Sequence, residues 1–374
     1  MSKIHITLVG GQPAPVYHGI VATEPDKVVF IYSASSRKAL DALEKEIGTI
    51  ASEKIELDVT SPLKIKLCAE RLSEQYHEDE ITVNISSGLK SWSHWFGVVF
   101  DKCPNASVVY MDQNNVLWNY RTMQASSDFE FDMHVLFRLY GNPLNNYTSY
   151  TDYTDDDFDA IPKIEQMRRF NYEVFNSLAT DLNKKKRHQL KYKQKGNFTE
   201  GSSMVEWDKD NTQVTLSIKG RKYGLKEEVI TSPHIVDLVF NASWFELKVA
   251  KLLSGWNKSK EICMNCRFPF KPNFDKNEVD IIVNTGVKNL FVECKTQIYD
   301  TTAIEKFCSV IKDYGGLGSK GLFVTDAPME DMAKTKCEEH GILTFSLQEQ
   351  HLGMSMEKAL YWLLDSELYN INTK

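Results

Sequence analysis

The chain has 374 residues, of which 42% are hydrophobic and 25% charged, a balance that suits two globular domains, each with its own core. The formal net charge of −7 argues against a basic coat over the whole surface, although a local basic patch would suffice to bind nucleic acid. No apolar run could span a bilayer, "MSKIHITLVGG" lacks the features of a signal peptide, and the seven cysteines are scattered, so we expect a cytoplasmic protein with free thiols and no membrane partner.

Strands and helices alternate through the first part of the chain. Strands are predicted at residues 3–9, 27–33, 54–59 and 80–86, helices at 39–47, 63–76 and between Gly88 and Phe100, and a hairpin at 106–112 and 116–120. This alternation predicts a mostly parallel, doubly wound sheet. Such a sheet binds ligands beyond the carboxyl ends of its strands, where the strand order switches.

Two loops fall at such strand ends. They are "VGGQPAPV" (9–16), here called the first-strand loop, and "NISSGLKSW" (84–92), the fourth-strand loop. In the second, small residues let backbone amides approach a ligand, and Lys90 would stand in the first turn of the next helix, ready to meet a phosphate. The chain has no dinucleotide fingerprint and no P-loop, and an ordinary strand-to-helix turn with a solvated lysine stays open.

The middle of the chain is read as a connector. Residues 142–160 are polar, acidic and rich in tyrosine, which is typical of a linker or an exposed loop. Pro162 is then expected to open a helix that continues through Leu182. The basic stretch "KKKRHQLKYKQK" (184–195) is either a solvated helix end or a contact with a phosphate backbone, and 212–218 reads as a strand.

Acidic residues occur inside two strands of the last third. Residues 279–283 and 290–295 read as an antiparallel pair, and a turn centred between Gly286 and Val287 would place Val283 opposite Leu290 and Asp280 opposite Glu293. Glu293 and Lys295 then share a face with Asp280, while Cys294 points the other way. Because two opposed carboxylates repel each other, a divalent cation such as Mg²⁺ or Mn²⁺ is expected between them.

Glu246 adds a third carboxylate. It lies in a predicted helix, 243–253, and begins a stripe with Val249, Ala250 and Leu253 that should face the core. A buried carboxylate needs a partner or becomes neutral, and a shared metal would be such a partner. The alternative is a set of satisfied salt bridges, for example between Glu293 and Lys295.

A helix, a strand with an acid, a strand with Glu-x-Lys and a further helix (301–313) together resemble the PD-(D/E)xK nuclease superfamily. The predicted strands 321–326 and 342–346 and the helix 328–340 continue this α/β core. The resemblance implies metal-dependent phosphodiester hydrolysis. Glu246, Asp280, Glu293 and the Cys294 carbonyl would be ligands of Mg²⁺ or Mn²⁺, Lys295 would assist the attacking water, and Glu278 is a further candidate ligand.

A doubly wound domain before such a core is similar to the CARF-domain ancillary nucleases of type III CRISPR systems. That resemblance implies a Rossmann-like CARF domain at 1–145, a connector at 146–235 and a restriction-endonuclease-like domain at 236–374. It implies a homodimer that cuts DNA, RNA or both when a cyclic oligoadenylate, most closely cyclic tetra-adenylate, binds. The implied activator contacts are Gly10, Gly11, Gln12, Ser86, Ser87, Gly88 and Lys90.

Two other functions stay open. One is a restriction or repair nuclease that needs no activator, and the other is a nucleotide-sensing regulator without catalysis. The pair Cys263 and Cys266 has the spacing of metal ligands, but no second pair follows it, so a structural zinc site is disfavoured.

Overall fold

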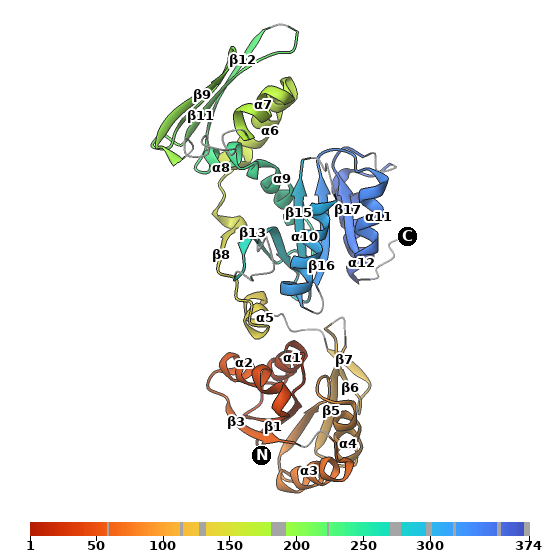
Figure 1. The fold of residues 1–374 in the computed structure, drawn as a ribbon. Helices are drawn as coiled ribbons and strands as arrows, with labels where there is room; N and C mark the ends of the chain where they lie inside the picture. The colour runs from red at the N-terminus through yellow and green to blue at the C-terminus, as the bar shows by residue number, and fades with distance from the viewer. Residues whose placement is uncertain are drawn as a thin grey trace.

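Three sheets follow one another along the molecule in the computed structural model (Figure 1). The structure describes residues 1–57, 60–112, 115–126, 132–180, 192–222, 224–269, 278–296, 301–316, 319–349 and 353–369. None of the helices in these ranges is long and apolar enough to cross a membrane.

The N-terminal sheet is the predicted parallel, doubly wound sheet, with strand order β3-β2-β1-β4-β5-β6-β7. Its parallel strands are β1 (Lys3–Leu8), β2 (Lys27–Tyr32), β3 (Ala51–Glu56), β4 (Glu80–Asn84) and β5 (Ala106–Met111), and β6 (Leu117–Asn119) and β7 (Gln124–Ser126) are antiparallel. Helices α1 (Ala14–Thr23) and α2 (Arg37–Ile47) cover one face, and α3 (Pro62–Gln75) and α4 (Lys90–Phe100) the other.

Two details of this sheet differ from the prediction. Helix α1 was not predicted, and residues 14–16 of the first-strand loop form its start. Proline is tolerated there, because its missing N–H would have no partner in the first turn of a helix. Strand β3 begins three residues earlier than predicted, and residues 58–59 lie outside the described ranges. It is the edge strand of its sheet and is mostly exposed, so its hydrophobic pattern is weak.

The supposed linker at 142–160 is not a loop. It contains strand β8 (Asn146–Ser149), which pairs with the C-terminal sheet, and the start of helix α6 (Asp155–Phe170). A capping box between Thr154 and Asp157 starts α6, and acids in its first turn suit the positive end of the helix dipole. Pro162 therefore lies inside α6 and does not open it.

The helix expected to continue through Leu182 is two helices. Asn171 is extended between α6 and α7 (Tyr172–Thr180), which breaks the helical run there. Leu182 and most of the basic stretch, residues 184–191, lie outside the described ranges. Tyr192 is exposed, and Lys195 begins the next strand.

A separate antiparallel sheet follows, with strand order β12-β11-β10-β9. Its strands are β9 (Lys195–Glu200), β10 (Ser203–Asp208), β11 (Gln213–Lys219) and β12 (Leu225–Thr231). Its apolar face, which includes Val205, Trp207 and Leu216, packs against α6, α7 and α8 (Ile235–Phe240). Segment 146–235 thus holds a packed subdomain, while the domain boundaries given above stay predictions.

The C-terminal sheet has the order β17-β16-β15-β14-β13-β8. Its strands after β8 are β13 (Glu261–Arg267), β14 (Glu278–Asn284), β15 (Asn289–Lys295), β16 (Ser319–Thr325) and β17 (Ile342–Ser346). One face packs against α9 (Ser243–Ser254) and α12 (Met356–Tyr369). The other packs against α5 (Met133–Leu139), α10 (Thr302–Val310) and α11 (Asp331–Glu339). The predicted fold class, two α/β domains in this order, is confirmed.

Candidate functional site

Strands β14 and β15 form the predicted hairpin. Val283 pairs with Leu290 and Ile281 with Val292, and extending this register by one residue places Asp280 opposite Glu293, as the sequence suggested. At that point the Asp280 carboxylate accepts a hydrogen bond from the backbone N–H of Cys294, 2.8 Å from its Oδ2. The acid is therefore fixed by the neighbouring strand.

Lys295 lies between the two strand acids. Its Nζ is 2.7 Å from Glu293 Oε1 and 3.4 Å from Asp280 Oδ2, and it donates to the Cys294 carbonyl at 3.1 Å. Asp280 and Glu293 are buried, with only 7% and 3% of their surfaces exposed. Burial alone would lower the pKa of Lys295, but the two carboxylates outweigh it and raise that pKa, so the lysine stays charged. The salt bridge considered as an alternative is present.

Glu246 approaches from the first turn of α9. Its Oε2 is buried and has no hydrogen-bond partner among the described residues. Burial, and after it the charge of Asp280, raises the pKa of Glu246 well above its usual value. The prediction that this helical acid faces inward toward the strand acids is confirmed, and its unsatisfied oxygen is what a cation would stabilise.

The donor set fits a hard divalent cation. Glu246, Asp280 and Glu293 offer carboxylate oxygens, and Cys294 offers its carbonyl, whereas burial raises the pKa of the Cys294 thiol and keeps it protonated. Lys295 now neutralises Asp280 and Glu293, so a bound ion would compete with its ammonium.

A different trio brings its ligand atoms within 4.8 Å of one another in the described part of the chain, namely His134, Glu261 and Cys263. His134 and Glu261 form an ion pair at 3.4 Å, which accounts for these two side chains without a metal.

The first-strand and fourth-strand loops meet at the ends of the adjacent strands β1 and β4. Gly10 N–H donates to Ser87 Oγ at 3.1 Å, and that hydroxyl donates to the Gln12 carbonyl at 3.1 Å. A Cβ on Gly10 would lie 2.6 Å from the backbone nitrogen of Gly88, which itself has a φ of +82°. The structure thus brings together the two loops that the sequence singled out.

The other candidate contacts differ in position. The Ser86 hydroxyl turns back into the sheet, where it accepts from the Met111 N–H at 2.7 Å. Gly11 and Lys90 are exposed, and Lys90 is the first residue of α4, as expected.

A cavity of about 680 Å³ adjoins these loops. Gly10 and Gly11 line it together with Ser35, Ser36 and Arg138, which the sequence analysis did not single out. Ser35 and Ser36 follow β2, so the rule of carboxyl strand ends could have found them. Arg138 comes from α5 and forms a 2.9 Å ion pair with Glu46 of α2. This contact joins residues far apart in the chain, so no local sequence pattern predicts it.

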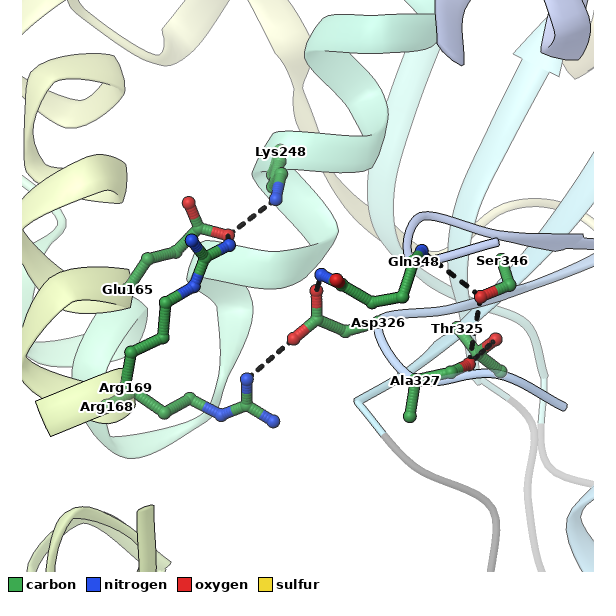
Figure 2. Close-up of polar contacts among 9 residues, drawn as sticks. All are labelled: Glu165, Arg168, Arg169, Lys248, Thr325, Asp326, Ala327, Ser346 and Gln348. Carbon is green, nitrogen blue, oxygen red and sulfur yellow. Dashed lines mark hydrogen bonds and ion pairs between the residues drawn. The ribbon is translucent and has the colours of Figure 1, made fainter. Parts of the chain in front are cut away.

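Two partly buried ion pairs near the strand ends were also missed, and one of them includes Asp326, which contacts Lys295. Asp326 directly follows β16, and its N–H donates to the Lys295 carbonyl at 3.3 Å. Figure 2 shows Arg168 of α6 pointing at Asp326, with Nη1 2.6 Å from Oδ2, and Lys248 of α9 pairing with Glu165 at 2.5 Å. Asp326 ends the predicted strand 321–326, which was the available signal.

Comparison with known proteins shows the fold. No protein-family model matches the chain, and no curated protein matches it. Among solved structures it is similar to Can2 from Sulfobacillus thermosulfidooxidans in complex with cyclic tetra-adenylate, with 15% identity, a TM-score of 0.68 and coverage of 98% of this chain and 99% of that one. It is similar to protein VC1899 from Vibrio cholerae, with 14% identity, a TM-score of 0.70 and coverage of 96% of both chains.

A third solved structure is a type III CRISPR defence DNA nuclease activated by cyclic oligoadenylate. It is 15% identical, with a TM-score of 0.59, and the match covers 96% of this chain and 52% of that one. The two-part α/β fold expected from the resemblance to CARF-domain ancillary nucleases is therefore the fold of this chain.

Proposed function

We propose that this protein is an endonuclease activated by a cyclic oligoadenylate in type III CRISPR antiviral defence, acting in the cytoplasm as a metal-dependent phosphodiesterase on DNA, RNA or both. The observation that carries the proposal is the convergence of Glu246, Asp280, Glu293 and Lys295 at one point of the C-terminal sheet. Three acids and one lysine suit phosphodiester hydrolysis, and nothing in a purely structural role calls for an unsatisfied buried carboxylate.

Each residue has a proposed task. Glu246, Asp280 and Glu293, with the Cys294 carbonyl, would hold Mg²⁺ or Mn²⁺, which when bound lowers the pKa of a water and offsets charge on the phosphate. Lys295 keeps its proton and would orient the attacking water or stabilise the negative charge that develops on the phosphate. The Cys294 N–H holds Asp280 in place.

The activator proposal is supported by the joined loops and by the cyclic tetra-adenylate bound to Can2. Gly10, Gly11, Gln12, Ser86, Ser87, Gly88 and Lys90 would contact it, with cyclic tetra-adenylate as the first candidate. A ring-shaped ligand with two-fold symmetry matches a homodimer in which each subunit contributes the same loops. The activator would shift the equilibrium by binding the cutting-competent arrangement more tightly.

The test is cleavage of single-stranded RNA, single-stranded DNA and supercoiled plasmid with Mg²⁺ or Mn²⁺, with and without cyclic tetra-adenylate. We expect cutting only when metal and activator are both present. Cutting without activator would favour the ungated restriction or repair nuclease. No cutting with cyclic tri-, tetra- or hexa-adenylate, combined with tight activator binding by calorimetry, would favour the regulator.

A further inference from the structure

A second cavity, of about 540 Å³, lies directly beside the proposed catalytic centre. Glu246 and Glu278 line it, and so do Asn241, Asn265, Tyr153 and His234. Its walls come from five separate parts of the fold, namely the segment before α6, Tyr192 just before β9, helix α8 with its flanks, α9 and the strand pair β13–β14. Anything bound there would touch the Glu246 side of the site.

The charges of this cavity disfavour a phosphate. Glu246 and Glu278 line it, and so does Asp237, while the Arg267 guanidinium is already 3.6 Å from the Glu278 carboxylate. Amide and aromatic groups supply its other polar contacts. A neutral, planar ligand with hydrogen-bonding edges fits these walls, and a nucleobase has those properties.

His234 is held in one tautomer. The Asp157 carboxylate accepts from its backbone N–H and contacts its Nδ1, both at 3.0 Å. Burial alone would raise the pKa of Asp157, but hydrogen bonds from Thr154 and His234 outweigh it and lower that pKa, so Asp157 is an acceptor and Nδ1 must carry the proton. With Nδ1 protonated, a ring that carries one proton has its acceptor at Nε2. The Tyr153 ring lies 4.8 Å from the imidazole, which gives the cavity a fixed aromatic wall.

Asn265 is placed at the cavity by an irregularity in β13. Its φ is +52°, and the pairing of β13 with β8 shifts register between Met264 and Arg267. Against β14, Met264 pairs with Ile281 and Cys266 with Val279, so Asn265 stands opposite Asp280. Bulges next to active sites re-aim side chains, and this one puts an amide beside a proposed metal ligand.

We propose that this cavity receives the unpaired base of the nucleotide adjoining the scissile phosphate, and that Asn241, Asn265 and His234 set the base preference at the cut. The inference rests on the proposed function. An asparagine amide offers a donor and an acceptor side by side, the pattern that matches an adenine edge, and Tyr153 offers a surface for stacking. Asn241 would exchange its bond to Asp237 Oδ1, 2.8 Å long, for a bond to the base. The base pocket and the catalytic acids share Glu246 as their common wall.

The first test reads the cleavage positions. Randomised single-stranded DNA and RNA are cut by the full-length protein with metal and activator, and the new ends are sequenced for the wild type, Asn241→Ala and Asn265→Gly. Glycine keeps the left-handed backbone at position 265 available. Asn197→Ala, at an exposed asparagine of β9, is the matched control. We expect a preferred base at one position beside the cut, weakened about tenfold in both cavity variants and kept in the control.

The second test does not depend on cutting. Fluorescence anisotropy with EDTA present compares a short oligonucleotide with versions that carry one abasic position each. We expect one abasic position to weaken binding by the wild type and to have little effect on binding by Asn265→Gly. Equal binding of all versions, or a cut-site preference that both variants retain, would overturn the base pocket while leaving the nuclease intact. A wild type that shows the abasic effect but never cuts would instead contradict the proposed function.

Discussion

At the scale of single residues, the Lys295 ammonium contacts the same carboxylates that are proposed to bind a metal. It contacts the carboxylates of Asp280 and Glu293 and donates to the backbone carbonyl of Cys294. The opposed carboxylates that made the sequence look unstable are therefore compatible in the folded chain before any cation binds. If the proposed metal binds these acids, it would replace part of the contacts that Lys295 makes with them.

Lys295→Met is expected to lower the single-turnover cleavage rate at least about 100-fold, because a charged donor to the developing negative charge is lost. Activator affinity, measured by calorimetry, should not change, since the loops lie in the other domain. Lys163→Met, at an exposed lysine of α6, is the control for loss of one positive charge. A variant that cuts at the normal rate would remove Lys295 from the catalytic set.

His5 provides a pH-dependent test of the N-terminal core. It is fully buried, its Nε2 has no hydrogen-bond partner among the described residues, and burial lowers its pKa from 6.5 to about 3. Between those pH values the unfolded chain binds a proton that the folded chain does not, so His5 reduces stability as the pH falls from 6.5 toward 3.

We expect His5→Leu to flatten this acid dependence. Thr23, which contacts His5 Nδ1 at 2.8 Å, keeps its bond to the Gly19 carbonyl at 2.9 Å and is not left unsatisfied. Thermal unfolding at pH 7.5 and pH 5 measures the effect. The difference in Tm should move in favour of the variant as the pH falls, and parallel curves for the two proteins would contradict the assignment.

At the scale of elements, the hairpin β14–β15 could be predicted, and the start of helix α6, before Pro162, could not. A turn at Gly286 and alternating side chains fix the register of a hairpin locally, so Val283 opposite Leu290 followed from the sequence. The Tyr- and Asp-rich segment before α6 has the composition of a loop. Its pairing with β13 and its capping box at Thr154 depend on partners that composition does not reveal.

The junction of the two loops can be tested at Gly10. A Cβ there would lie 2.6 Å from the Gly88 backbone nitrogen, so Gly10→Ala must push the loops apart. We expect activator binding to weaken about tenfold, as overpacking of this kind costs 1–3 kcal/mol, with cutting restored at saturating activator. Gly97→Ala, in α4 of the same domain, is the matched control, because a Cβ at Gly97 would meet nothing within 4 Å. Equal activator affinities for the two variants would show that the contact between Gly10 and Gly88 does not contribute to activator binding.

The Arg168–Asp326 ion pair joins α6 to the end of β16. Both side chains are largely buried, and the guanidinium also lies 4.8 Å from the Tyr172 ring and 5.5 Å from the Trp244 ring. Arg168→Leu should destabilise the protein by about 3–5 kcal/mol in urea unfolding, because Asp326 is left charged and buried. The double variant with Asp326→Leu should recover much of that loss. A double variant no more stable than Arg168→Leu would show that the pair contributes little through its charge.

At the scale of the whole molecule, Tyr140 connects the two halves. Its hydroxyl donates to Gln12 Oε1 at 2.9 Å, and a Cβ on Gly316 would lie 3.0 Å from its ring. Burial raises the pKa of Tyr140 to about 12, so it remains a donor at any physiological pH. Nearby, Asn142 donates to the Asp313 carbonyl at 2.8 Å. One side chain thus touches a proposed activator residue and the C-terminal domain.

Tyr140→Phe removes the hydroxyl and keeps the ring on Gly316. We expect activator affinity to change little and activator-stimulated cleavage to fall about tenfold, within the usual range of coupling energies. Calorimetry and cleavage at saturating activator measure the two quantities separately. Tyr120→Phe, at an exposed tyrosine of the N-terminal domain, is the control. Normal stimulation in Tyr140→Phe would place the coupling elsewhere.

No pattern in the sequence reveals this connection, because Gln12, Tyr140 and Gly316 are far apart in the chain and each is locally ordinary. The order of the two domains followed from alternating strands and from the acids of β14 and β15. The packing of α5 between the domains could not be predicted from either of these features, because its apolar residues are compatible with any core.

During synthesis, strand β8 is made long before its partner strand. It pairs with β13, yet the whole of the second sheet is made between them, so Ser149 waits for Cys263 to emerge. At roughly 5–20 residues per second, that wait is on the order of ten seconds. A fragment beginning at residue 236 would expose the bare edge of β13 and is prone to aggregate. On the ribosome, the N-terminal sheet can therefore be finished before β13 to β17 of the C-terminal sheet are made.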